Sequence, residues 1–337
     1  MKYFFLALIL TMSLSITNAQ TSNIIHLNNK TIEVIGLEHW TVKMIQDSLN
    51  KYSPGDSLQS HACAAILRFK LHFADAAVMV SFPDATDYSK QYVLVSVVEP
   101  EDSARVHYRK NSIDFDSLSI KPEWKLGINM IIRHPMGFQA GLSLSLMNDS
   151  AKKSFNYSFM DTTGVASFEA FLKSHSSSLD GEEARSALRT DLNTYDQMIA
   201  AAILTQFSGD DSTWWSLLES QLDSRGPVPS VAQQVLWGLA AYKAHPINWV
   251  PEASTIHSIL DGTDLFSLPA VCNALTRTGA NPKWAKAFLR DGGRMLLAYA
   301  GAQQEYASKP ALKLLRELSG KDYGNKIEFW RKWIGSL

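Results

Sequence analysis

Between residues 31 and 99 the spacing of apolar positions changes repeatedly, and each spacing predicts one element. Residues 32–35 alternate as a strand does and end at Gly36. Thr41 suits the N-cap of a helix, because the apolar side chains that follow it recur on one face. That face consists of Val42, Ile45, Leu49 and Tyr52. A second helix is expected to bury Cys63, Ile66, Leu67 and Leu71, and strands are expected over 76–82 and 92–98. The predicted order is β-α-α-β-β.

The last of these strands is apolar on both faces. One face carries Val93, Val95 and Val97, and the other carries Tyr92, Leu94 and Val98. Two helices cover only one face of a three-stranded sheet. We therefore expect either the downstream helical part or a partner to cover the second face.

Several local features accompany this order of elements. They are Gly36 after the first strand, Pro54-Gly55-Asp56 between the helices, Leu71-His72-Phe73 before the second strand, and Glu99 after the last. Together they resemble a POTRA (polypeptide-transport-associated) domain, over residues 22–100. The resemblance implies work in the cell envelope, holding or passing polypeptides near a membrane. Only one copy is present, so an insertase function is not carried over.

The segment 103–165 is less regular. Helices are expected over 122–133 and 136–147, on either side of His134-Pro135. The second could also be a strand, because Leu142, Leu144 and Leu146 alternate. Residues 148–163 are polar and are expected to form a loop.

A repeat marks the segment 166–337. Four residues, Ala200, Ala232, Val271 and Ala311, are each followed by side chains at i+3, i+4 and i+7 that are apolar except for Thr278. Second amphipathic stretches follow at 214–222, 255–260, 284–297 and 327–334. Helix pairs at this interval resemble HEAT-type repeats, which stack into an α-solenoid. The last stretch has a single apolar stripe, as the end of a stack requires.

The first residues predict export. Lys2 precedes an apolar run over 3–14, and Thr17-Asn18-Ala19 supplies small residues for cleavage, which is the layout of a secretory signal over 1–19. The formal net charge of −1 argues against nucleic acid as the main ligand. Cys63 and Cys272 are expected to be buried, without a disulfide or a metal site.

Local motifs for catalysis are missing from the sequence. It contains no HExxH, GxSxG, P-loop, GxGxxG or paired CxxC, and its nine histidines are dispersed. The acid pairs 182–183 and 210–211 fall at expected helix starts, where negative charge is favoured. We therefore assign no catalytic, cofactor-binding or metal-ligating residue.

The resulting interpretation is an exported, non-enzymatic scaffold protein of the cell envelope, close to a membrane but without a transmembrane segment. Polypeptide partners are expected at a sheet edge carrying Tyr92 and Leu94. They are also expected on the helical surface at Trp214-Trp215, although both indoles could instead be buried between repeats. The alternative is an exported hydrolase whose site is assembled from distant residues, such as Ser150, His175 and Asp180.

Overall fold

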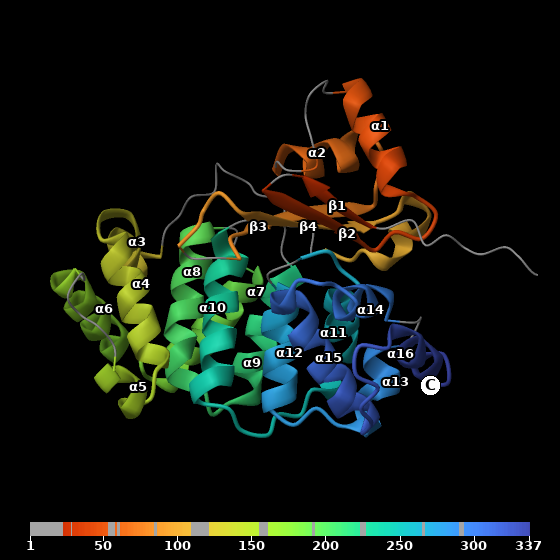
Figure 1. Ribbon diagram of the computed structural model, residues 1–337. Helices are drawn as coiled ribbons and strands as arrows, with labels where there is room; N and C mark the ends of the chain where they lie inside the picture. The colour runs from red at the N-terminus through yellow and green to blue at the C-terminus, as the bar shows by residue number, and fades with distance from the viewer. Residues whose placement is uncertain are drawn as a thin grey trace, which may run out of the picture.

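The computed structural model describes residues 23–27, 29–52, 58, 61–83, 86–108, 121–154, 161–190, 193–222, 227–264, 267–289 and 293–337. In these residues a small four-stranded sheet with two helices is followed by a larger body of helices (Figure 1). The signal-like segment and Pro54-Gly55-Asp56 lie outside the described residues.

The sheet has the order β1-β2-β4-β3, with β1 (Ile24–Leu27), β2 (Lys30–Ile35), β3 (Asp75–Ser81) and β4 (Gln91–Val98). Strands β2 and β4 are parallel, and the other two pairs are antiparallel. Helices α1 (Val42–Tyr52) and α2 (His61–Phe69) lie between β2 and β3 in the chain. The predicted order β-α-α-β-β is therefore present, and β1 adds an edge strand that the sequence pattern did not predict.

The prediction that Tyr92 and Leu94 lie on an edge strand of the sheet is wrong. Both residues belong to β4, which pairs with β2 on one side and with β3 on the other. The main-chain groups of an interior strand are used within the sheet, so no peptide can pair with β4.

Different helices pack against the two faces of the sheet. Towards α1 and α2 the sheet presents Ile32, Val34, Ala76, Val78, Val93, Val95 and Val97, which form one core with those helices. The opposite face presents Ile35, Ala77, Met79, Leu94 and Val98, and these belong to the core of the helical body. The downstream helices thus cover the second face, as one of the two alternatives anticipated.

Gly36 lets the chain leave β2 at the edge of this interface. Its φ of +89° lies in the left-handed region, and a Cβ there would come within 2.1 Å of the carbonyl oxygen of Val97. Only glycine satisfies both conditions, which explains why the strand ends at this residue.

The helical body begins with four helices in the segment that the sequence left uncertain. They are α3 (Lys125–Arg133), α4 (Pro135–Leu146), α5 (Asp149–Ser154) and α6 (Thr162–Ser174). Residues 136–147 are thus helical for nearly all their length, and the expectation of a loop over 148–163 is wrong at α5 and at the start of α6.

The remaining elements are α7 (Ser178–Thr190), α8 (Thr194–Ile203), α9 (Asp211–Glu219), α10 (Pro227–Tyr242), α11 (Ala253–Leu260), α12 (Ser267–Arg277), α13 (Ala285–Phe288), α14 (Arg294–Ala300), α15 (Glu305–Ser319) and α16 (Ile327–Ile334). Short 3-10 helices connect several of them: η1 (Pro100–Arg105), η2 (Pro122–Trp124), η3 (Leu204–Phe207), η4 (Ser220–Leu222), η5 (Val250–Glu252) and η6 (Pro282–Trp284).

The four repeated segments begin in α8, α10, α12 and α15. Each of these helices contacts the next, so together they form one layer (Figure 1). Helices α7, α9, α11 and α13 also contact one another in that order. The predicted second stretch at 284–297 is instead divided into α13 and α14, and Gly293, the N-cap of α14, has a left-handed backbone conformation.

Candidate functional site

Polar groups are concentrated where the sheet meets the helical layer. The carboxylate of Glu33 on β2 is buried and accepts the N–H of Gln303, just before α15, at 3.0 Å. It also accepts the hydroxyl of Tyr92 at 2.5 Å. Burial, together with this carboxylate, raises the pKa of Tyr92 far above its ordinary value. Tyr92 therefore faces the seam between sheet and helices, and it is not placed to receive a peptide.

A second buried carboxylate repeats the arrangement at the start of α12. Asp75 on β3 accepts the hydroxyls of Thr263 and Tyr108. The hydroxyl of Ser96 on β4 donates to the carbonyl of Thr263 at 2.7 Å. The two carboxylates thus tie the sheet to the segments that precede α12 and α15.

A chain of charged groups continues along the seam. Arg294 on α14 contacts Glu38 at 3.0 Å and Asp102 on η1 at 3.1 Å. Arg105 then contacts Asp102 at 2.8 Å and Asp261, after α11, at 3.4 Å. The chain ties the segment after β2, the segment after β4 and two helices of the body together.

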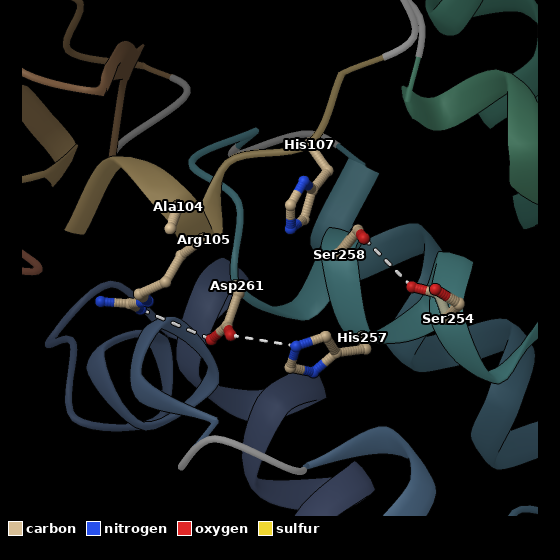
Figure 2. Close-up of a pocket in the computed structure, with 7 residues that line it drawn as sticks. All are labelled: Ala104, Arg105, His107, Ser254, His257, Ser258 and Asp261. Atoms are coloured by element: carbon tan, nitrogen blue, oxygen red, sulfur yellow. Dashed lines mark hydrogen bonds and ion pairs between the residues drawn. The ribbon is translucent and has the colours of Figure 1, made fainter.

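The charged chain ends at a cavity of about 470 Å³ between η1 and α11. Its lining consists of Ala104, Arg105, His107, Ser254, His257, Ser258 and Asp261. Figure 2 shows Asp261 between Arg105 and His257, with the ring of His107 directed towards the same space. Cavities that combine a few converging polar groups in this way are the usual starting point in a search for a ligand site.

The chemistry of this cavity centres on Asp261 and His257. Nε2 of His257 lies 3.8 Å from Oδ2 of Asp261. Burial raises the pKa of the Asp261 carboxyl, against the opposing effect of Arg105. The Ser258 hydroxyl donates to the carbonyl of Ser254, one helical turn earlier, at 3.1 Å. The pair could exchange a proton with a ligand, but Ser258 is engaged by its own helix and is not poised as a nucleophile.

A second polar cluster lies beside the seam and has a structural explanation. Candidate metal-ligating atoms of His39, Glu99 and Glu101 lie within 4.8 Å of one another. The Glu99 carboxylate, however, already accepts the backbone N–H groups of residues 38, 39 and 40, and Nδ1 of His39 lies 2.9 Å away. This carboxylate holds the turn between β2 and α1, so the cluster gives no support for a metal site.

The two tryptophans expected on the helical surface are differently placed. Trp214 is fully buried, and its indole N–H donates to the carbonyl of Ser208 at 2.9 Å. Trp215 is half-buried and donates to the carbonyl of Asn248 at 3.0 Å. The expectation that Trp214 serves as a surface anchor is therefore wrong, and the alternative of burial holds for it. Leu94, the other expected contact residue, is also fully buried.

The exposed tryptophan is Trp237 on α10, with 41% of its surface accessible. The repeat contained the signal for it. In the second copy the buried stripe runs through Ala232, Val235, Leu236 and Leu239, and position 237 falls off that stripe. An indole at an off-stripe position of an otherwise core-forming helix predicts exposure.

Two of the three residues named for a hydrolase serve local structure. Nδ1 of His175 lies 2.9 Å from the carbonyl of Phe171 at the end of α6. Asp180 accepts the N–H of Ser177 at 2.8 Å at the start of α7. Ser150 lies in α5. Helix ends account for His175 and Asp180 without catalysis.

Within the described residues no helix is long and apolar enough to cross a bilayer. No protein-family model matches this chain, and searches of curated proteins and of solved structures likewise gave no match.

Proposed function

We propose that this chain is an exported, non-enzymatic interaction protein of the cell envelope, in which a POTRA-like module is fused to a HEAT-like array. The observation that carries the proposal is the exposed indole of Trp237 on the layer formed by α8, α10, α12 and α15. Tryptophan is enriched among the residues that dominate binding energy at protein interfaces.

The HEAT-like part of the proposal rests on the order of contacts. The helices that carry the repeated motif, α8, α10, α12 and α15, contact one another in sequence order. Helices α7, α9, α11 and α13 form a second series whose members also contact one another in sequence order. At the end of the chain, α16 buries Trp330 and Ile334 and leaves its other faces exposed. A helix with one buried stripe of this kind is typical of a capping repeat.

The POTRA-like part rests on the sheet. Elements β2, α1, α2, β3 and β4 follow one another in the order expected from the resemblance, with Gly36 after β2 and Glu99 after β4, and β1 is an additional strand. Because β4 is interior, the proposal assigns binding to the helical surface and not to this strand.

The surroundings of Trp237 suit a polypeptide partner. Its neighbour Gly238 brings α10 against α4, where a Cβ would meet the Leu146 side chain at 2.6 Å. The amide of Gln234, one turn earlier, donates to the Ser143 hydroxyl on α4 at 3.3 Å. An amphipathic indole on a rigid two-helix support offers a large contact area with little loss of conformational entropy.

Affinity purification from solubilised cell envelope tests this proposal. We expect the chain without residues 1–19 to retain one dominant partner, and Trp237→Ala to weaken that binding about 30-fold, the scale of an interface hot spot. Phe69→Ala is the matched control, since Phe69 is 71% exposed on α2, on the far side of the sheet. If both variants retain the partner equally well, Trp237 is not part of the interface. If the unaltered chain retains no partner, the proposal is contradicted.

The alternative function, an exported hydrolase, is favoured by one observation, the His257–Asp261 pair in the cavity. If the protein is a hydrolase, it should turn over ester or peptide substrates. His257→Ala should then abolish this activity without changing the fold. Turnover that survives this substitution, or none with the unaltered chain, would contradict it.

A further inference from the structure

Positive charge is concentrated at one end of the molecule. Residues 281–337 contain eleven basic and five acidic side chains, a formal charge of +6, although the whole chain carries −1. The first 280 residues therefore carry −7. This separation gives the molecule a basic end and an acidic remainder.

Four lysines and one phenylalanine of the basic end have exposed side chains, and one of these lysines, Lys326, lies over the phenylalanine ring. Lys283, Lys321, Lys326 and Lys332 are exposed, and none of them forms an ion pair within the part of the chain that the structure describes. Phe329 is 51% exposed. We call these five residues the lysine–phenylalanine strip.

Contacts between the segments that carry the strip bring its residues to the same part of the molecule. A Cβ on Gly320 would lie 3.6 Å from the ring of Pro282, so the residues that directly precede Lys321 and Lys283 are in contact. The rings of Tyr323 and Phe329 stack with their centroids 5.9 Å apart, and Nζ of Lys326 lies 5.6 Å from the Phe329 ring. Lys332 follows Phe329 by three residues on α16, on the adjoining surface.

The strip belongs to a rigid support. Trp330 and Ile334 on the opposite side of α16 are buried, and α16 packs against α14. Figure 1 shows α13 and α16 together at the end of the helical body, far from α3 and α6. The positive groups are therefore presented on a fixed surface at an extremity of the molecule.

We propose that the lysine–phenylalanine strip docks this protein onto the surface of an anionic phospholipid bilayer. Each lysine ammonium group near such a surface is attracted as a point charge. It does not need the bidentate hydrogen-bond geometry by which arginine recognises individual phosphates. An exposed aromatic ring among them can enter the boundary between headgroups and acyl chains. The acidic remainder then points away from the membrane, which orients the molecule.

A bilayer fits these observations better than a polyanionic chain. Nucleic acid or an acidic polypeptide would extend past the strip and meet the acidic remainder, whereas a flat membrane contacts only the extremity. The docking does not depend on the proposed binding at Trp237, which lies on α10, away from the strip.

Vesicle binding tests the proposal with the chain lacking residues 1–19. We expect binding to vesicles of phosphatidylcholine with about 30 mol % phosphatidylglycerol, no binding to phosphatidylcholine alone, and loss of binding at high salt. Lys326→Gln with Lys332→Gln should lower the partition coefficient about 25-fold, from roughly fivefold for each lysine. Phe329→Ala should lower it further.

The control is Lys51→Gln with Lys70→Gln, which changes the charge equally on exposed residues of the sheet module. Circular dichroism and thermal unfolding verify that every variant is folded. The proposal would be overturned if the control weakened binding as much as the test variant or if anionic vesicles were not bound. Tighter binding to polyglutamate or to duplex DNA at the same salt would overturn it as well.

Discussion

At the scale of single residues, Glu99 shows how one side chain holds the junction of the sheet module. Its carboxylate is buried, although acids are seldom buried without partners, and three backbone N–H groups and the ring of His39 surround it. Burial alone would raise the pKa of this carboxyl, but the three N–H groups outweigh burial and hold it below the ordinary value of 4.5. A group with a lowered pKa in the folded state stabilises the fold whenever it is ionised.

We predict that Glu99→Gln lowers the free energy of unfolding by about 1–3 kcal/mol at pH 7, since hydrogen bonds to a charged acceptor are replaced by weaker ones. The contribution is fully present above the ordinary pKa of 4.5, and it is lost as the pH falls from there through the lower pKa of the folded state. Urea unfolding of both proteins at a series of pH values measures it. A stability difference that stays constant down to the most acid pH would contradict the assignment.

At the scale of elements, the sequence predicted most definitely those helices that have one buried and one exposed side. Residues 327–334 have a single apolar stripe, and α16 forms with those bounds. Helix α4 is buried on several sides, so its apolar positions did not separate helix from strand. Strand β1 has only four residues and is half exposed, which is too short for a period to show. The division of residues 284–297 into α13 and α14 was also missed, and the left-handed backbone of Gly293 at the start of α14 is a feature that no apolar pattern encodes.

The same contrast, between the buried and the exposed side of α16, gives a prediction about stability. Trp330→Ala removes a fully buried indole whose N–H donates to the carbonyl of Gly324 at 2.9 Å. We expect it to destabilise the fold by about 3–5 kcal/mol. Phe329 directly precedes Trp330 but is exposed, so Phe329→Ala should change the free energy of unfolding by less than about 0.5 kcal/mol. Thermal unfolding compares the two, and similar losses from both would show that α16 is oriented differently.

At the scale of the whole molecule, the most informative sequence pattern was the alternation of apolar residues on both faces of β4. Its two apolar faces predicted a second cover for the sheet, and the structure supplies that cover from the helical body, with Leu94 in a shared core. The candidate site could not be predicted in the same way. Arg105, His257 and Asp261 are brought together from segments more than 150 residues apart, and no local spacing records that contact.

A shared core predicts that the two parts unfold together. Cys63 in α2 and Cys272 in α12 both carry buried thiols, so each reports on one part. Burial also raises the pKa of the Cys272 thiol, which therefore reacts only after unfolding. Pulse labelling along a urea series should modify both cysteines at the same midpoint, and Leu94→Ala should shift both midpoints equally. Two separate midpoints would show that the sheet module is an independent domain.

The central claim is that the exposed face of the helical layer, marked by Trp237, binds a polypeptide partner. Photo-crosslinking tests it most directly, with a photoreactive amino acid at position 237 in one protein and at position 69 in another, each expressed in the cell and exported. We predict one discrete crosslinked product from position 237 and none from position 69. A product from position 69 alone, or no product from either position, would contradict the claim.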